Sequence, residues 1–267
     1  AVFEKYLSLL GVRAHSPSRS ALGELVQAQL TRVPFENISK LYLKRQRGAD
    51  YMPSLEEHLE GIERFNFGGT CYANNYYFSL LLGNLGYDVA LCGADMSAPD
   101  VHLVSMVRLA GREWLVDVGY AAPFFEPLPL GLDTEHEIRF GSCRYVLMPR
   151  DQRGCSRLQM FRAGELVHGY LAKPKPRSID HFEGVIRGSY RDSATFMNAA
   201  VAERFSPGRS VRIHNLTLIE STPEGVASAE LSGPEQLVQA LERHCGIPAA
   251  VVRDAVDGLA LEGDIYT

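Results

Sequence analysis

Cys71 stands where a cysteine can act as a nucleophile. It follows Gly68, Gly69 and Thr70 and precedes the apolar run TyrTyrPheSerLeuLeuLeu (76–82). Threonine is a good helix N-cap, so the pattern predicts that a helix begins at Cys71. The free N–H groups and the dipole of a helix start stabilise a thiolate, and the same N–H groups can hold the oxyanion of an acyl intermediate. The alternative interpretation is a buried structural thiol at a tight turn.

A thiolate nucleophile needs a base, and the base needs a group that orients it. His102 begins a predicted strand, and Asp117 lies in the next apolar stretch, TrpLeuValAspValGly (114–119). If Ala110-Gly111 form a two-residue hairpin loop, His102 and Asp117 are diagonal neighbours on one face of the sheet. A buried carboxylate without a partner is unfavourable, so a histidine partner would explain Asp117. A register shifted by one residue would put the two side chains on opposite faces.

Other chemistries have little support in the sequence. It contains no Gly-x-Ser-x-Gly, Gly-x-Gly-x-x-Gly or Walker A motif, which argues against a serine hydrolase elbow and a nucleotide site. Cys71, His102 and Asp117 have no fourth ligand at metal-site spacing, so no metal is expected. Six other histidines are expected at the surface or in loops, without a catalytic role. They are His58, His136, His168, His181, His214 and His244.

The elements that must position these residues divide the chain into helical and strand-rich regions. Before about residue 86 the apolar residues have helical spacing. Gly11 is expected to end a first helix, Ser20 to cap a second, and Ser54 with Glu57 to form a capping box. Short β-type runs follow, and after them a helix is expected to begin at Pro234. The runs are 87–92, 102–109, 114–119 and 211–219. Helices followed by a strand-rich half predict an α+β fold.

Composition limits the possible partners. The 267 residues are 46% hydrophobic, which is enough for a real core, and the net charge of −5 provides no basic stripe for nucleic acid. No apolar run is long enough to span a membrane, so no membrane partner is expected. Five widely spaced cysteines, without a Cys-x-x-Cys, are expected to be reduced thiols of a cytoplasmic protein.

Four segments resemble, in order and spacing, the marker segments of the arylamine N-acetyltransferases. They are "RVPFENIS" (32–39), "GGTCYANN" (68–75), "HLVSMV" (102–107) and "WLVDVGY" (114–120). A later stretch, "DHFEGVIRGSYRDSATFMN" (180–198), is similar to that family's entry into its third subdomain. The resemblance implies that Cys71, His102 and Asp117 form the family's catalytic triad.

The same resemblance implies the architecture and the activity. An N-terminal helical bundle at 1–85 would carry Cys71, a central β-barrel at 86–190 would carry His102 and Asp117, and an α/β lid would follow at 191–267. The catalytic core would be of the cysteine-protease or transglutaminase type. The chain would move an acyl group from acetyl-CoA or another acyl thioester, used as co-substrate, to an aromatic amine or hydrazine. No permanently bound cofactor is implied.

The chain departs from the family pattern beside the nucleophile. Asn66 and Phe67 stand where the family usually has two arginines, one of which normally pairs with the glutamate of Pro-Phe-Glu-Asn, here Glu36. A buried Glu36 needs a cation or a proton, and Arg64 is the nearest candidate partner in the sequence. We therefore expect Glu36 and Arg64 to give the catalytic turn structural support.

The substrate pocket is less clearly indicated than the triad. Phe35, Tyr120, Phe124 and Phe125 lie in or beside the matching segments and could wall a flat slot for an aromatic amine. An equal alternative is that Phe124 and Phe125 only fill the core. A short basic cluster, Lys173, Lys175 and Arg177, could contact a phosphate-bearing donor such as coenzyme A.

Two rival functions remain. One is a biosynthetic acyltransferase or amide synthase of the same family that takes its acyl group from an acyl carrier protein or a larger thioester. The altered arginines and the added phenylalanines favour it. The other is a non-enzymatic binding module, against which the complete triad argues.

Overall fold

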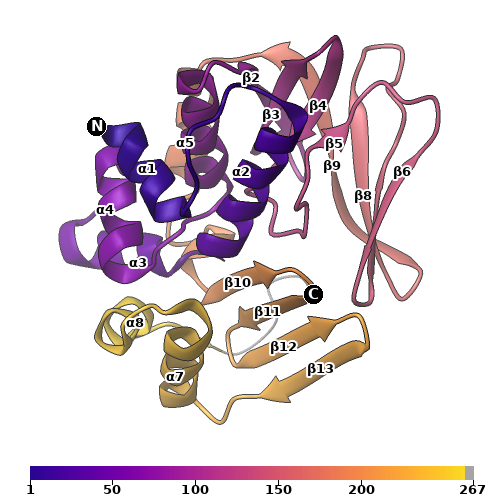
Figure 1. The fold of residues 1–267 in the computed structure, drawn as a ribbon. Coiled ribbons are helices and arrows are strands. Elements are labelled where there is room, and N and C mark those ends of the chain that lie inside the picture. The colour runs from indigo at the N-terminus through magenta and orange to yellow at the C-terminus, as the bar shows by residue number, and fades with distance from the viewer. Residues whose placement is uncertain (262–267) are drawn as a thin grey trace.

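The computed structural model describes residues 1–261, and helices form its N-terminal third (Figure 1). They are α1 (Val2–Leu10), α2 (Arg19–Arg32), α3 (Ile38–Arg47), α4 (Leu55–Phe65) and α5 (Cys71–Asn84). Gly11 ends α1 in the left-handed conformation, and Ser54 and Glu57 form the predicted capping box of α4. The cap of α2 is Ser18, so the prediction of Ser20 is wrong by two residues. Helix α3, directly after the Pro-Phe-Glu-Asn segment, has no counterpart among the predicted elements.

An eight-stranded antiparallel sheet forms a nearly closed barrel beside these helices, as predicted. Its order is β5 (Leu128–Pro129), β4 (Arg112–Val116), β3 (His102–Leu109), β2 (Asp88–Asp95), β9 (Glu165–Pro176), β8 (Ser156–Arg162), β7 (Cys143–Leu147) and β6 (His136–Phe140). Helix α5 packs on β2 and β3. The helix that begins at Cys71 therefore lies directly against the strand that His102 begins.

A second, five-stranded antiparallel sheet joins one strand of the helical N-terminal third to four strands of the C-terminal part. Its order is β1 (Phe35–Glu36), β10 (Val201–Ser206), β11 (Arg209–His214), β12 (Thr217–Thr222) and β13 (Gly225–Glu230). The predicted single run 211–219 is instead a hairpin, because Asn215 turns the chain with a φ of 48°. Helices α7 (Pro234–Cys245) and α8 (Ala249–Val256) follow, and α7 begins at Pro234 as predicted.

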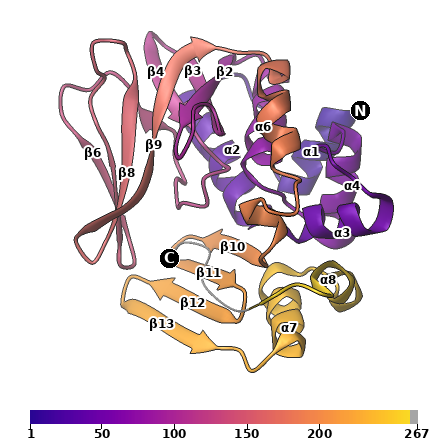
Figure 2. The same ribbon diagram turned by 180° about the vertical axis from the view of Figure 1, so that it is seen from behind.

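The segment between the two sheets packs over the start of α5. It contains η1 (Ile179–Phe182), α6 (Glu183–Gly188) and η2 (Thr195–Met197), and Figure 2 shows α6 on the face opposite to that of Figure 1. Ile186 and Tyr190 share one hydrophobic cluster with Cys71 and Tyr72. The division into subdomains at residues 85 and 190 stays a prediction.

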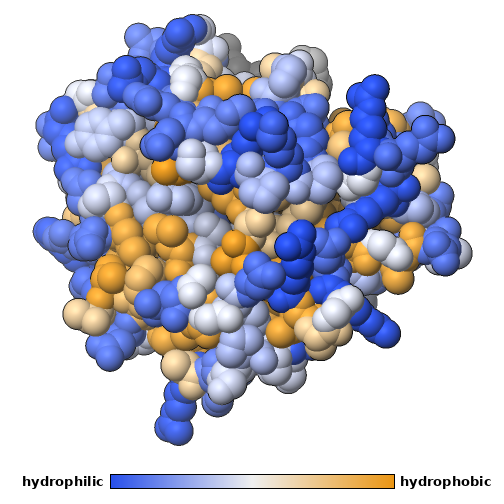
Figure 3. Space-filling model, turned by 90° about the horizontal axis from the view of Figure 1, so that it is seen from above, coloured by the Kyte–Doolittle hydropathy of each residue, from blue (hydrophilic) through white to orange (hydrophobic). Residues whose placement is uncertain are grey.

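The surface is mixed in character. On the face drawn in Figure 3, hydrophobic residues gather in small patches between charged ones. Within residues 1–261, no helix has both the length and the apolar character needed to cross a membrane.

Candidate active site

The turn before α5 depends on two glycines. A Cβ atom on Gly68 would stand 1.7 Å from the carbonyl oxygen of Pro34, so no larger residue fits there. Gly69 has a φ of 100°, which favours glycine. Thr70 occupies the N-cap position of α5, as predicted, but its side chain caps none of the first N–H groups. Cys71 is therefore the first helical residue, 9% exposed, beside uncapped N–H groups.

Glu36 holds this turn from behind. Its Oε1 accepts hydrogen bonds from the backbone N–H groups of Gly68 (2.8 Å) and Gly69 (2.7 Å), and its Oε2 accepts one from Ser39 N–H (2.8 Å). The residue is completely buried. Burial raises the pKa of Glu36, and the three backbone hydrogen bonds oppose that rise. The carboxyl group thus ties the start of α3 to the turn before Cys71.

The prediction that Arg64 pairs with Glu36 is wrong. Helix α4 continues through Arg64 to Phe65, so this segment is not the extended one that such a contact needs. Its guanidinium instead pairs with Glu60, one helical turn back, at 2.7 Å, and its side chain is 60% exposed. Backbone amides, and not a cation, satisfy Glu36.

His102 and Asp117 meet as the hairpin geometry predicts. Ala110 and Gly111 both have positive φ, 51° and 74°, and the β3–β4 register is that of a two-residue loop. His102 Nε2 lies 2.8 Å from Asp117 Oδ2, and the two side chains are 2% and 0% exposed.

Asn75 links α5 to this pair. Its Nδ2 donates to Asp117 Oδ1 (2.8 Å) and to the Leu103 carbonyl oxygen (2.7 Å), and its Oδ1 accepts from Val118 N–H (2.9 Å). Asp117 Oδ1 also accepts from Gly119 N–H at 3.0 Å. Asn75 is a residue of the site for which no role was predicted from the sequence. The available signal was its spacing, because a polar residue four positions after Cys71 lies on the same helix face.

The electrostatics favour a charged pair. Burial lowers the pKa of His102, but the Asp117 carboxylate and a side-chain hydrogen bond with Cys71 outweigh it and raise that pKa from 6.5 to about 10. Burial raises the pKa of Asp117, but its contacts with His102, Asn75 and Gly119 bring it below its ordinary value. At neutral pH this geometry therefore favours an imidazolium on His102 beside the Asp117 carboxylate.

Aromatic rings surround the imidazole. The His102 ring centre lies 5.1 Å from that of Tyr170 and 5.9 Å from that of Tyr120. The Tyr120 hydroxyl lies 2.7 Å from Nδ1 of His168, which is exposed on β9. His168 is thus a surface residue, as expected, but it contacts a ring of the site.

The four predicted pocket rings do not form one slot. Tyr120 and Phe124 share the barrel cluster, where their rings stack at 6.1 Å. Phe124 is 1% exposed, so it fills the core, which is the alternative that the sequence left open. Phe125 packs edge-on against Phe205, and Phe35 belongs to a separate small cluster. Tyr120 is therefore the ring of this set that lies beside His102.

The predicted basic cluster is partly neutralised. Lys173 Nζ lies 2.6 Å from Asp95 Oδ1 and 2.7 Å from Asp100 Oδ1, and His181 also pairs with Asp100. Lys173 therefore fixes the loop before His102, which reduces its availability to a phosphate.

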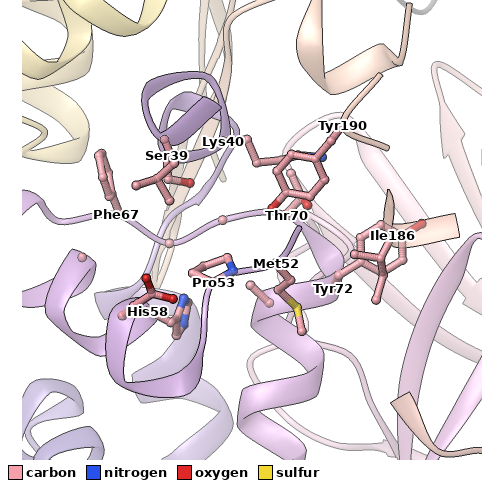
Figure 4. Close-up of a pocket in the computed structure, with 16 residues that line it drawn as sticks. Ser39, Lys40, Met52, Pro53, His58, Phe67, Thr70, Tyr72, Ile186 and Tyr190 are labelled. Atoms are coloured by element: carbon pink, nitrogen blue, oxygen red, sulfur yellow. The ribbon is translucent and has the colours of Figure 1, made fainter. Parts of the chain in front are cut away.

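A cavity of about 40 Å³, which we call the α3–α5 cavity, lies behind the catalytic turn (Figure 4). His58 faces it and is 5% exposed, so the expectation of a surface position is wrong for this histidine. Its Nε2 has no hydrogen-bond partner among the described residues. The lining residues are Ser39, Lys40, Leu43, Met52, Pro53, Glu57, His58, Gly61, Phe67, Gly68, Gly69, Thr70, Tyr72, Ala73, Ile186 and Tyr190.

Metal binding has no support in the part of the chain that the structure describes. Residues 1–261 contain no group of three or more His, Cys, Asp and Glu side chains that could hold an ion. What the site combines is a thiol, an imidazolium and a carboxylate, at a helix start with uncapped N–H groups.

Comparison with known proteins gives one consistent family. A family model described as N-acetyltransferase matches residues 20–252. Proansamycin X synthase of Amycolatopsis mediterranei is 39% identical over 82 residues, which are 28% of this chain and 31% of that protein. The arylamine N-acetyltransferase, pineal gland isozyme NAT-3, of Gallus gallus is 32% identical over 174 residues, 61% of this chain and 57% of that protein. The chain thus spans about a third to somewhat over half of these relatives' length.

The fold comparison covers nearly the whole chain. The solved structure of Mycobacterium marinum arylamine N-acetyltransferase in complex with CoA superposes with a TM-score of 0.81 at 20% identity. The superposition covers 96% of this chain and 99% of that one. At this identity the likeness establishes the fold, which agrees with the predicted helical, barrel and lid arrangement.

Proposed function

The chain belongs to the arylamine N-acetyltransferase family, and we propose that it transfers an acyl group from a thioester such as acetyl-CoA to an aromatic amine or hydrazine through an acyl intermediate on Cys71. The observation that carries the proposal is the buried pair of His102 and Asp117, 2.8 Å apart, which Asn75 joins to the helix that begins at Cys71. This is the arrangement of an activated thiol nucleophile.

In the first half-reaction the Cys71 thiolate attacks the thioester carbonyl carbon. The uncapped N–H groups at the start of α5 are available to stabilise the oxyanion that develops. As the intermediate collapses, the carbon–sulfur bond to the donor breaks and His102 gives its proton to the departing thiolate. The products are acyl-Cys71, a neutral His102 and a free thiol such as CoA.

In the second half-reaction the amine attacks acyl-Cys71. His102 accepts the proton that the amine loses, and the Cys71 thiolate departs as the amide forms. The imidazolium and thiolate are thereby restored, and the net reaction converts thioester and amine into amide and thiol. Asp117 and Asn75 keep His102 in one orientation throughout.

The donor is a thioester because a thiolate leaving group suits exchange with a cysteine. The relative of known structure determined with CoA supports acetyl-CoA as this co-substrate. Lys175 and Arg177 remain candidates for contact with its phosphates.

A second candidate is an amide synthase that uses a larger thioester or a carrier-protein donor. The observation that favours it is the local identity with Proansamycin X synthase, 39% over 82 residues. An experiment separates the two. Acyl-CoA is compared with acyl-pantetheine donors, which lack the nucleotide part of CoA, by the rate of Cys71 acylation. Aniline-type acceptors are added afterwards. Faster acylation by acetyl-CoA and turnover with arylamines support the first function. Acylation by pantetheine-linked donors alone would support the second.

A further inference from the structure

Lys40 is a buried cation with neutral contacts. It lies in the first turn of α3 and is 5% exposed. Its Nζ donates to the carbonyl oxygen of Ser189 (2.8 Å) and to Ser189 Oγ (2.9 Å), and it lies 4.1 Å from the centre of the Tyr190 ring. Within residues 1–261 no carboxylate forms an ion pair with it. A buried ammonium without a counter-charge is unfavourable, so its position calls for a nearby anion.

The α3–α5 cavity puts Lys40 beside the helix start that carries Cys71. Lys40, Thr70 and Tyr72 line the same cavity, and Thr70 and Tyr72 are the residues on either side of Cys71. Figure 4 shows Lys40 and Tyr190 together near Thr70. Cys71 packs in one hydrophobic cluster with Tyr190, whose ring faces the ammonium. Burial raises the pKa of both tyrosines, so they stay neutral.

The other ionisable groups around the cavity do not supply the missing negative charge. Glu36 turns its carboxyl group to three backbone amides, and Glu57 pairs with Arg47 at 2.7 Å. Burial lowers the pKa of His58 to about 4, so this ring is neutral at physiological pH. Lys44, one turn further along α3, is a second cation.

The remaining candidate for the counter-charge is the thiolate. Burial lowers the pKa of Lys40 to about 8, the negative charge of Cys71 opposes this lowering, and the positive charge of Lys44 adds to it. The two groups therefore favour each other's charged forms.

We propose that Lys40 is a positioning residue that stabilises the Cys71 thiolate from the α3 side of the catalytic turn, while His102 acts on it from β3. The inference rests on the proposed acyl transfer through Cys71. It adds a second cation to the site, supplied by the helix that follows the Pro-Phe-Glu-Asn segment.

The effect has a defined pH window. Because the pKa of Lys40 is lowered to about 8, its ammonium is present below that pH and is lost above it. Its help to the thiolate should be greatest at pH 6–7 and should disappear above about pH 9.

The test is the rate of Cys71 alkylation by iodoacetamide from pH 5 to pH 10, followed by mass spectrometry. Lys40→Met should slow alkylation about tenfold at pH 6–7 and move the midpoint of the profile up by about one pH unit, with convergence above pH 9. Lys40→Arg should keep most of the wild-type rate. Lys44→Met is the matched control, since Lys44 Nζ also holds this segment, at the Tyr190 carbonyl oxygen. Lys44 also lowers the pKa of Lys40, so this control is compared at pH 6–7, where Lys40 is charged with or without it, and the alkylation rate there should be unchanged.

Overlapping profiles of Lys40→Met and wild type would overturn the proposal, and so would an equal slowing of alkylation at pH 6–7 in Lys44→Met. A second measurement needs no variant: the ¹³Cε resonance of Lys40 is titrated in wild-type protein before and after alkylation of Cys71. Removal of the thiolate should lower the midpoint from about pH 8, and an unchanged midpoint would contradict the proposal. Acylation of wild-type Cys71 by acetyl-CoA, measured beside these, reports on the proposed function separately.

Discussion

Replacement of Glu36 tests how the catalytic turn is held. Its carboxyl group accepts three backbone N–H groups, those of Ser39, Gly68 and Gly69, in a completely buried position. Glu36→Ala leaves all three without a partner, and each buried, unsatisfied group costs about 1–3 kcal/mol. We therefore expect a loss of about 3–9 kcal/mol in the free energy of unfolding.

Glu36→Gln is the sharper variant because it keeps the shape. The glutamine amide has one acceptor oxygen and one NH₂ group. In the place of the Glu36 carboxyl group, the NH₂ group must therefore face backbone N–H groups that also donate. At least one N–H group then stays unsatisfied, which predicts a loss of about 2 kcal/mol. Alkylation of Cys71 should also slow, because Gly68 and Gly69 lose part of their support.

The assay is urea unfolding followed by the fluorescence of Trp114, the single tryptophan of the chain. Glu60→Gln is the matched control, since it removes an exposed carboxylate whose pair with Arg64 contributes about 0–1 kcal/mol. Equal stabilities of Glu36→Gln and Glu60→Gln would refute the reasoning. Arg64→Ala should unfold like wild type, because Arg64 does not support Glu36.

Three other expectations follow from the site and the core. The pKa of His102 is raised from 6.5 to about 10, so its pair with Asp117 contributes fully to the free energy of unfolding below pH 6.5, and this contribution is lost as pH rises through 10. In urea unfolding at several pH values, His102→Gln should show a smaller decline of the free energy of unfolding over this range than wild type. Asn75→Ala removes the link from α5 to Asp117 and should slow Cys71 acylation about 10- to 100-fold at wild-type substrate affinity, whereas an unchanged rate would make Asn75 only structural. Phe124 is 1% exposed, so Phe124→Ala should lower the free energy of unfolding, measured in urea, by about 3–5 kcal/mol. A near-neutral change with a raised Michaelis constant for arylamines would show instead that Phe124 lines the substrate pocket.

Local signals were sufficient for the helix start at Cys71 and for the pair of His102 and Asp117. The start of α5 follows from the glycines and Thr70, and the contact of His102 with Asp117 follows from a two-residue loop that fixes the register. Both inferences need only neighbouring residues. The pairing of Cys71 with His102 would join a helix to a strand, and only the family resemblance implied it.

Contacts between distant segments could not be derived in this way. Glu36 finds its partners in a turn more than thirty positions later, and Lys40 finds Ser189 almost 150 positions later. For the same reason the sequence did not predict the neighbours of Phe35 and Phe125, which depend on how the second sheet packs. A single sequence predicts which rings are apolar but not which rings meet.

Intact-protein and peptide mass spectrometry after brief incubation with acetyl-CoA would detect a covalent acyl intermediate on Cys71. We expect one acetyl group per chain, located on Cys71, absent from Cys71→Ala and Asp117→Asn, and discharged as an N-acetyl product when an arylamine is added. An acetyl group on Cys143 or Cys155 in place of Cys71 would disprove this intermediate, as would acetylated amine formed by Cys71→Ala at the wild-type rate.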